Sequence, residues 1–563
     1  MGKLVSKFNP NSDIKSISVN GVDLTVHETY YKPGHNIGGI TRAVKNLTVS
    51  GKLPIGTGIS ADSFKAVAAG KNAEISFFSD CACEKCLCGY NIAAGENLIY
   101  AKVKDGETGD CQIYTVVIIG TGDAKFDAAY NKYAEPTVIV SDIDSVRVAM
   151  DESQPGQVIG VVKGDYYVFA ESKYNPRPRF DNKHNVILRS ISGDFEDVTF
   201  WGSGLHKLNA DGENVAGAYQ AATPHNEMIE IGGASSDIVL YGITIRESNA
   251  NGYKINGTNE RNITLDTCRA IDICEYMVKG SGPSNDLFVF NLTIVNCHFE
   301  NTKRANYIPQ SDHTIQCGGY IGAIDIMNTR VSYIADNKFI NLLGNSADKY
   351  SYHNFGAIGF WGQGGHEDAL VERNFIYNCG SAIMLGLTGE LSSGRPTVNR
   401  GIVRNNIIFA SGWDAITSCN TRDVQIYNNT IIRGVEDPNG IDRGIRDAYG
   451  NSKNLTIKNN LAHSFQMNGI DAHDDVIIED NLVVGDIDPD TYFVNLPKEN
   501  RCAELALYYH DNNVKPEDFA LTDKAVNAIG KAQALPVLVD EDYFGNKRGG
   551  NPDIGAHQFS AQK

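Results

Sequence analysis

The sequence predicts an all-β protein in which a small antiparallel β-sandwich precedes a parallel β-helix of about ten coils. Two observations carry this prediction. Short alternating apolar segments, separated by Gly and Asn turns, occupy residues 1 to 120. From about residue 184 to residue 490, a repeat of three short apolar segments takes over, and stacked coils of three strands would bury such segments in one continuous core.

The first domain is expected at residues 1–120, as a β-sandwich that serves as an accessory module. Its strands are predicted within SISVNGVDLTV, KNLTVSGKLPIG, AEISFF and QIYTVVIIG. The opening and the later stretch GENLIYAKVKDGETGDCQIYTVVI resemble the cadherin-like, or Ig-like, β-sandwich domains of secreted bacterial proteins, from which a cysteine-rich insert departs. Residues 121–136, TGDAKFDAAYNKYAEP, are interpreted as a linker.

The second domain is predicted to span residues 137–563. A short helical pattern, a Pro-Gly turn and a strand open it, in DIDSVRVAMDESQPGQVIGVVKGDYYV. The repeat follows, with segments such as DIVLYGITIRES, ALVERNFIYNC and VQIYNNTIIRG. The tail, which ends in DEDYFGNKRGGNPDIGAHQ, is expected to cover the open end of the stack, since the end of a solenoid needs a cap.

Asparagine recurs at the turn between two strands of the repeat. This residue tolerates a left-handed backbone and its amide can bond to the asparagine of the next coil. The residues interpreted in this way, in preference to glycosylation sites, are Asn374, Asn405, Asn406, Asn428, Asn429, Asn459, Asn460 and Asn481.

Composition excludes several classes of function. The chain has 563 residues and a formal net charge of −18, which would repel a phosphate backbone, so no nucleic-acid partner is expected. The mean hydropathy of −0.26 and the absence of a long apolar run argue against a membrane span. No segment of signal-peptide length stands among the first thirty residues, so a secreted or cell-surface location requires a leader that has been removed.

Twelve cysteines are unevenly distributed along the chain. The motif CACEKCLC, residues 81 to 88, places four thiols close together, which suits zinc, disulfides or free thiols. It lacks the second, distant CxxC of a zinc ribbon, so disulfides or free thiols are favoured over metal. The cysteines from Cys268 onward are expected to act as small buried apolar residues.

The repeat resembles the right-handed parallel β-helix proteins of the pectate-lyase-like superfamily, from about residue 135 to the C-terminus. The stretches that carry the resemblance include GAIDIM with IADNKFINL, GAIGFWG with LVERNFIYNC, and the closing DYFGNKR with PDIGAHQ. It implies a right-handed coil and a carbohydrate as the substrate class. The superfamily contains lyases, hydrolases, epimerases, esterases, fructotransferases and non-catalytic adhesins, so the resemblance does not choose among these activities.

One strand of each repeat places a polar residue between or after two apolar ones, and alternation turns this residue outward. Residues of this kind form one outward row along the stack. It is predicted to contain Glu230, Lys254, Lys279, Asp325, Gly359 with Trp361, Met384, Thr417, Arg446, and Asp471 with His473. Lys254, Lys279 and Asp325 should therefore lie on consecutive coils, about 4.8 Å apart.

Two insertions, residues 300–320 and 343–356, interrupt the corner before this strand, and long loops on a rigid scaffold often carry binding groups. Their cationic and aromatic residues, together with the tryptophan of the row, suit the carboxylates and ring faces of an acidic sugar chain. The predicted substrate-binding residues are Lys303, Tyr307, His313, Tyr350, Tyr352 and Trp361.

The predicted function is that of a polysaccharide lyase that cleaves an acidic, uronate-containing chain by β-elimination. The superfamily resemblance implies that a Lys or Arg acts as the base. It also implies that the uronate carboxylate of the substrate is neutralised, often by Ca²⁺. Lys279 is the candidate base because a neighbouring cation lowers the pKa of a lysine. Lys254, Arg304 and His353 are predicted to support it, and Asp325 to be a calcium ligand.

Two alternatives stay open. A glycoside hydrolase needs two carboxyl groups about 5 to 9.5 Å apart, whereas Glu230 and Asp325 would be separated by roughly 14 Å. A loop carboxylate such as Asp312 or Glu367 could instead complete a pair with Asp325. The second alternative is a non-catalytic protein that holds glycan in the same groove.

Overall fold

The computed structural model describes most of the chain. The described residues are 9–27, 30–31, 44–168, 177–202, 227–248, 250–282, 284–302, 321–342, 356–386, 391–409, 414–432, 443–467, 475–484, 488–497, 514–535 and 537–560. They divide into two compact units. The N-terminal unit comprises Met1–Val168, Lys183–Phe200 and Val239–Thr244, and the C-terminal unit comprises Phe169–Asn182, Trp201–Ile238 and Ile245–Lys563.

The N-terminal unit contains a β-sandwich. One sheet has the order β2-β1-β8, formed by Val22–Asp23, Ile14–Val19 and Phe64–Ala68. The second has the order β3-β6-β12-β11-β9, formed by Thr25–His27, Thr48–Pro54, Cys111–Thr121, Gly95–Lys104 and Glu74–Phe78. Two short pairs complete it, β10-β7 (Tyr90–Asn91 with Gly58–Ile59) and β4-β5 (Tyr30–Tyr31 with Val44–Lys45). The pairing of β12 with β6 is parallel, so the sandwich is not purely antiparallel.

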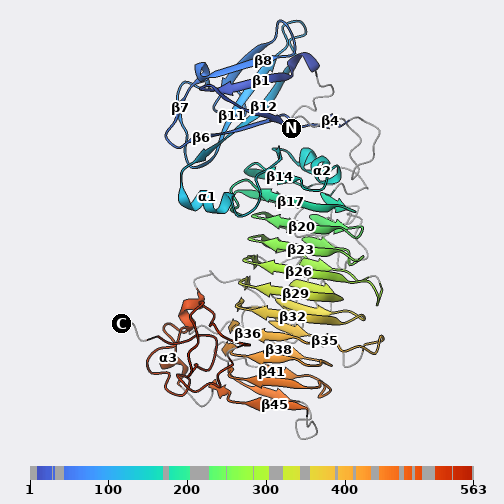
Figure 1. The fold of residues 1–563 in the computed structure, drawn as a ribbon, viewed down its shortest axis with the longest axis vertical. Coiled ribbons are helices and arrows are strands. Elements are labelled where there is room, and N and C mark those ends of the chain that lie inside the picture. The colour runs from blue at the N-terminus through green and yellow to red at the C-terminus, as the bar shows by residue number, and fades with distance from the viewer. Residues whose placement is uncertain are drawn as a thin grey trace, which may run out of the picture. The chain divides into compact units, whose positions relative to one another are not determined.

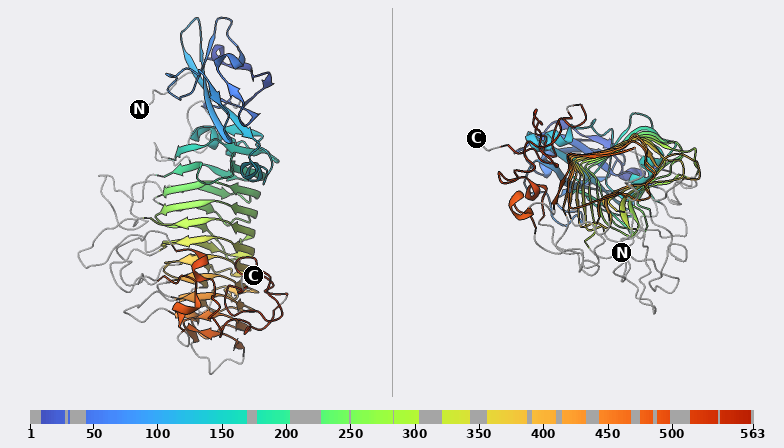
Figure 2. Two further views of the ribbon diagram at one scale, coloured as in Figure 1. Left: turned by 90° about the vertical axis from the view of Figure 1, so that its left-hand side faces the viewer. Right: turned by 90° about the horizontal axis from the view of Figure 1, so that it is seen from below.

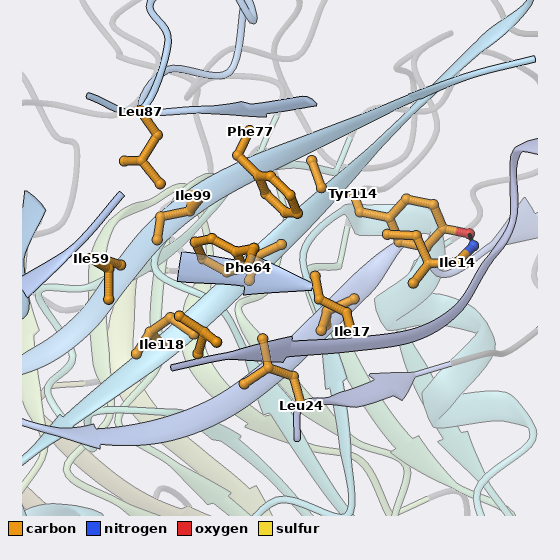
Figure 3. Packing of buried hydrophobic residues seen from close by; sticks show 14 of the residues in the cluster. Ile14, Ile17, Leu24, Ile59, Phe64, Phe77, Leu87, Ile99, Tyr114 and Ile118 are labelled. Carbon is orange, nitrogen blue, oxygen red and sulfur yellow. Dashed lines mark hydrogen bonds between the residues drawn. The ribbon is translucent and has the colours of Figure 1, made fainter. Parts of the chain in front are cut away.

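Alternate residues of these strands form one apolar core. Ile17 from β1, Ile99 from β11 and Tyr114 from β12 are each no more than 3% exposed and pack in the same cluster. Figure 3 shows this packing, with Phe64 and Phe77 among the enclosed side chains. Their rings are stacked, with centroids 4.3 Å apart.

The stretch predicted as a linker contains helix α1 (Ala124–Tyr130), which Asp123 caps by accepting a hydrogen bond from the Phe126 N–H. Tyr130 at its end is buried in a cluster with residues of β12. Helix α2 (Ile143–Asp151) follows, and its cap Asp142 accepts from Ser145. Residues 143–151 therefore adopt the predicted helix, while the proposed domain boundaries stay a prediction.

Three long sheets of parallel strands form the parallel β-helix, as predicted. The first sheet has thirteen strands, of which twelve follow the order β13 (Val138–Val140), β14 (Val158–Val161), β17 (His184–Ser190), β20 (Ser236–Tyr241), β23 (Arg261–Asp266), β26 (Val289–Val295), β29 (Thr329–Ala335), β32 (His366–Glu372), β36 (Ile402–Arg404), β39 (Gln425–Tyr427), β42 (Leu455–Lys458) and β45 (Val476–Glu479). The remaining strand, β35 (Val398–Asn399), pairs with β32.

The second sheet has eleven strands. Its order is β15 (Gly164–Tyr167), β18 (Val198–Trp201), β21 (Thr244–Ser248), β24 (Arg269–Ile273), β27 (His298–Glu300), β30 (Lys338–Ile340), β33 (Phe375–Tyr377), β37 (Ile407–Phe409), β40 (Thr430–Ile432), β43 (Leu461–Ala462) and β46 (Leu482–Val483).

The third sheet has ten strands and contains the predicted outward row. Its order is β16 (Arg179–Asp181), β19 (Ile229–Gly232), β22 (Tyr253–Ile255), β25 (Tyr276–Gly280), β28 (Gly322–Met327), β31 (Ile358–Trp361), β34 (Ile383–Leu385), β38 (Asp414–Ser418), β41 (Arg443–Asp447) and β44 (Phe465–Met467).

Successive coils in the C-terminal unit lie directly on one another. Figure 1 shows β23, β26, β29 and β32 as a regular stack, and the views in Figure 2 show the same coils from the side and along the stack. From β14 to β34 every third strand returns to the same sheet, which is the connectivity of a parallel β-helix with three strands per coil. Within the described residues, no helix is long and apolar enough to cross a membrane.

The asparagine turns have two separate roles. Where two asparagines are adjacent, the first has a left-handed backbone: Asn405 (φ 53°), Asn428 (φ 51°) and Asn459 (φ 59°). The second points inward and joins a buried ladder. In this ladder each side-chain amide donates to the side-chain oxygen of the next coil at 2.9 to 3.0 Å, through Asn337, Asn374, Asn406, Asn429, Asn460 and Asn481.

Replacing Asn429 by alanine should destabilise the protein by about 2 to 4 kcal/mol. Its amide donates to Val403 O and Asn460 Oδ1, and its oxygen accepts two bonds from Asn406, so several buried groups would lose partners at once. Urea unfolding measures the change. The control is Asn291→Gly in an exposed pair, where Gly preserves the left-handed turn and less than about 1 kcal/mol is expected. Equal losses in the two variants would contradict this account of the ladder.

The described tail residues contain helix α3 (Pro489–Tyr492) and 3₁₀ turns, including Pro516–Phe519. The sequence analysis places this tail over the open end of the stack. Its buried side chains, among them Phe493 and Phe519, pack instead against the outward residues of the second sheet, such as Phe375 and Phe409. These outward residues of the second sheet are apolar, and without the tail they would be exposed to water. The described tail lies along the side of several coils because it covers them.

Candidate functional site

The third sheet brings the predicted row into register. Glu230 pairs with Lys254, Lys254 with Lys279, and Lys279 with Asp325, on the four strands from β19 to β28. The row continues through Gly359, Met384, Thr417 and Arg446, as predicted. The neighbouring register, Tyr253 with Val278 and Ile324, is buried in the core. The row thus lies on the outward face of these strands.

Lys279 and Asp325 form an ion pair on adjacent coils. The Lys279 ammonium donates to Asp325 Oδ2, and the two side chains are only 9% and 1% exposed. The ammonium also lies 4.9 Å from the centroid of the Tyr276 ring, a cation–π contact. Lys279 is therefore a fixed, partnered charge within the row.

Lys254 has a different environment, although it lies one coil away. Its ammonium donates to Ser281 Oγ and stands 4.0 Å from a carboxylate oxygen of Glu227. Burial lowers the pKa of Lys254, the charge of Lys279 lowers it further, and the carboxylates of Glu227 and Glu275 oppose this. The neutral amine of Lys254 therefore forms at lower pH than that of an ordinary lysine.

Arg177, which precedes β16, holds the carboxylates at the N-terminal end of the row. It contacts both Glu230 and Glu227, the latter at 2.9 Å. Asn256 donates to the other oxygen of Glu230 at 2.7 Å. These contacts fix Glu227 beside Lys254 and give the Glu230 carboxylate its partners.

The surroundings of Asp325 fit poorly with its predicted role as a calcium ligand. Burial raises the pKa of the Asp325 carboxyl, whereas Lys279, Trp361 and Lys254 act in the opposite direction. One oxygen is paired with an ammonium, and two cations face the group, which disfavours a divalent cation. Among the described residues, no group of three His, Cys, Asp or Glu side chains is arranged to hold a metal.

Removal of one member of this ion pair should destabilise the fold. Asp325→Ala leaves the Lys279 charge buried without its partner, at a cost of about 3 kcal/mol. The double variant Lys279→Met with Asp325→Leu should recover most of this loss, because it removes both charges and keeps apolar volume. Urea unfolding of Lys279→Met, Asp325→Leu and the double variant closes a mutant cycle and measures the coupling. Additive losses would show that the two groups do not interact.

Seven predicted residues lie outside the described part of the chain: Lys303, Arg304, Tyr307, His313, Tyr350, Tyr352 and His353. Asp471 and His473 of the row lie outside it as well. Their roles stay predictions. Trp361 is described, half-buried at the end of β31 and in register with Met327.

Among the residues that contact the row, Ser281, Glu227 and Arg177 were not predicted from the sequence, and neither were Asn256 and Tyr276. Ser281 was open to prediction, since it follows Lys279 by two positions and therefore turns to the same side of the strand. Glu227 and Arg177 precede their strands, where alternation does not apply. No signal in the sequence indicates that they face each other.

The fold and the row together define a right-handed parallel β-helix protein with a polar outward row on one sheet. It is similar to the solved structure of the pectate lyase Pel9A, with a TM-score of 0.44 and 12% identity over 73% of this chain and 90% of that chain. It is also similar to an alginate lyase from Paenibacillus sp. str. FPU-7, with a TM-score of 0.27 and 10% identity over 61% and 99% of the two chains.

A third similar structure is an exopolygalacturonase from Thermotoga maritima, with a TM-score of 0.30 and 12% identity over 63% of this chain and 95% of that chain. No protein-family model matches the sequence, and no curated protein matches it.

Proposed function

We propose that the protein is a carbohydrate-active enzyme, and specifically a lyase that cleaves an acidic, uronate-containing polysaccharide by β-elimination at the outward row. The observation that carries the proposal is the pair of stacked lysines in different environments: Lys279 is ion-paired, while burial lowers the pKa of Lys254. One cation for a carboxylate and one amine that can accept a proton are what this reaction requires.

In this proposal the base is Lys254 rather than Lys279. Its neutral amine takes the proton from the carbon next to the uronate carboxylate, and the electron pair of that bond forms the new double bond. The glycosidic oxygen leaves from the adjacent carbon and takes up a proton. Ser281 and Glu227 hold the amine in place through the contacts described above.

Lys279 contributes charge. Its ammonium is held in the row by the ion pair with Asp325, and in this proposal its positive charge stabilises the negative charge that develops on the uronate carboxylate as the proton leaves. Calcium would provide the same stabilisation if the loops contributed its ligands, and that requirement remains part of the proposal. We also propose a secreted or cell-surface location, where polysaccharide is available.

Hydrolysis is the second candidate. A buried carboxyl with a raised pKa, such as that of Asp325, is suited to act as a general acid. The engagement of Asp325 by Lys279 weakens this reading, as does the separation of three coils between Asp325 and Glu230. A binding protein without activity is the third candidate.

Product analysis tests the proposal. The full chain is incubated with acidic polysaccharides, with and without a chelator, and the absorbance of unsaturated uronate products is followed in the ultraviolet. A lyase gives rising absorbance, and its loss on chelation would support the calcium requirement. Shorter chains without this absorbance would establish hydrolysis, and retained but uncleaved polysaccharide would establish binding alone.

A further inference from the structure

The sandwich has a shallow cavity of about 410 Å³ that is widely open to solvent and is lined by no residue of the outward row. It is formed where β7 and β10 pair and where the chain enters the 3₁₀ turn at Ala61–Ser63. The lining residues are Gly58, Ile59, Ser60, Ser63, Gly89, Tyr90 and Asn91. All of them belong to the N-terminal unit.

No charged side chain is among these lining residues, in a chain whose charged residues make up 21% of the sequence. The cavity therefore lacks the cationic side chains that usually bind an anion. It also lacks the carboxylates that usually bind a cation. The lining consists of one aromatic ring, one amide, two serine hydroxyls, two glycines and Ile59. Hydroxyl-rich, uncharged ligands match such a surface.

The frame of the cavity is rigid. Ile59 anchors β7, since it is 3% exposed and its side chain lies in the sandwich core (Figure 3). Tyr90 is fixed at both ends, because its ring packs partly against the core and its hydroxyl donates to Asn97 Oδ1 at 3.0 Å. Asn97 is itself buried and donates to the carbonyls of Gly95 and Ile118. The ring is thus held half-buried at the cavity without depending on a ligand.

The residues beside the Tyr90 ring leave open space for a ligand and a side-chain amide that can bind it. A side chain added at Gly89 would meet no atom within 4 Å of its Cβ, so the space above this residue is open. Asn91 is exposed, and within the described residues no hydrogen bond engages its side-chain amide. A rigid ring beside a free amide and small residues resembles the surfaces on which pyranose rings stack and donate hydrogen bonds.

From this we infer that the sandwich has its own carbohydrate site, which takes a neutral glycosyl unit and is distinct from the cationic row proposed to act on uronate. The ring of Tyr90 stacks on the apolar face of the sugar. Asn91 and the serine hydroxyls bind its hydroxyl groups, and the Ser63 hydroxyl, which accepts a hydrogen bond from the Ser60 N–H at 3.0 Å, does so as a donor. The site would hold the protein on neutral parts of a mixed polysaccharide, whether or not the row is catalytic.

The test is affinity gel electrophoresis of the full chain in gels that contain a soluble neutral β-glucan, galactan or mannan, with polygalacturonate as the acidic arm. We expect at least one neutral polymer to retard the protein. Tyr90→Ala and Gly89→Leu, the second of which fills the open space, should each weaken that retardation about tenfold. Lys254→Met, which alters the row alone, should leave it unchanged.

Asn91→Ala guards against misfolding, because this residue is exposed and its loss leaves the core intact. It should weaken retardation while the melting temperature stays the same. Retardation by none of the neutral polymers overturns the inference, as does wild-type retardation of folded Gly89→Leu and Asn91→Ala. Retardation by polygalacturonate alone, lost in Lys254→Met, would assign binding to the row instead.

Discussion

Lys254→Met is expected to lower the rate of β-elimination by about 10²- to 10⁴-fold, the usual contribution of a general base. The methionine keeps most of the apolar volume of the lysine stem and removes the amine that accepts the proton. The measurement is the initial rate of ultraviolet absorbance increase on the acidic polysaccharide that the screen identifies. The fold should survive, because the Lys279–Asp325 ion pair remains.

The pH dependence separates a base from a binding cation. Because burial lowers the pKa of Lys254, its neutral fraction grows at lower pH than for an ordinary lysine, and kcat/KM should rise with pH through that pKa. Lys254→Arg keeps the charge but cannot release its proton, so this variant should stay inactive over the same range. An active arginine variant would contradict the role of base.

Lys338→Met provides the matched control. Lys338 lies on β30 in the second sheet and is exposed. Its replacement should leave both the rate and the pH profile unchanged. A similar loss in the two variants would attribute the effect to net charge rather than to the position of Lys254 in the row.

Glu96→Gln is expected to change the pH dependence of stability. Glu96 on β11 is 6% exposed, accepts from the Lys163 N–H at 2.8 Å, and has a second oxygen without a hydrogen-bond partner. Burial raises the pKa of its carboxyl from 4.5 to about 8, the nearby Asp197 adds to this, and Lys163 opposes it. The folded protein therefore retains a proton that the unfolded chain releases.

This proton sets the direction in which stability changes with pH. Between pH 4.5 and about 8 the folded state binds more protons than the unfolded state, so stability contributed by Glu96 is complete below pH 4.5 and is lost as the pH rises through 8. The shift corresponds to about 5 kcal/mol. Glu96→Gln cannot titrate, so the variant should gain stability relative to the wild type by up to that amount between pH 4 and pH 9.

Urea unfolding at a series of pH values measures this difference. Glu74→Gln on the neighbouring strand β9 is the control, since Glu74 is exposed and its replacement should leave the curve parallel to that of the wild type. Curves of identical slope for Glu96→Gln and the wild type would show that Glu96 does not titrate in this range.

The row was predictable because a strand repeats every two residues and each coil pairs in register with the next. This periodicity correctly places Lys254, Lys279 and Asp325 on consecutive strands. The same alternation predicts Ser281 beside them. No specific long-range information is needed for such a prediction, since the stack itself supplies the contact between residues separated by dozens of positions.

Partner choice within the row was not predictable. Lys254 and Lys279 have the same side chain and the same register, yet Asp325 pairs with one and Glu227 approaches the other. The difference arises from rotamers, from burial, and from Arg177, which brings Glu227 to the row from a segment outside the strand pattern. For this reason the sequence favours Lys279 as the base, whereas the proposal made above takes Lys254.

The asparagine ladder also has a direction. Five of the side-chain amides, those of Asn337, Asn374, Asn406, Asn429 and Asn460, donate to the asparagine oxygen of the following coil, so these side-chain bonds all point the same way along the stack. Aligned hydrogen bonds polarise one another, and each link is strongest when its C-terminal neighbour is in place. Loss of the last coil is therefore expected to weaken the asparagine bonds of the coils before it, along the ladder from Asn337 to Asn481.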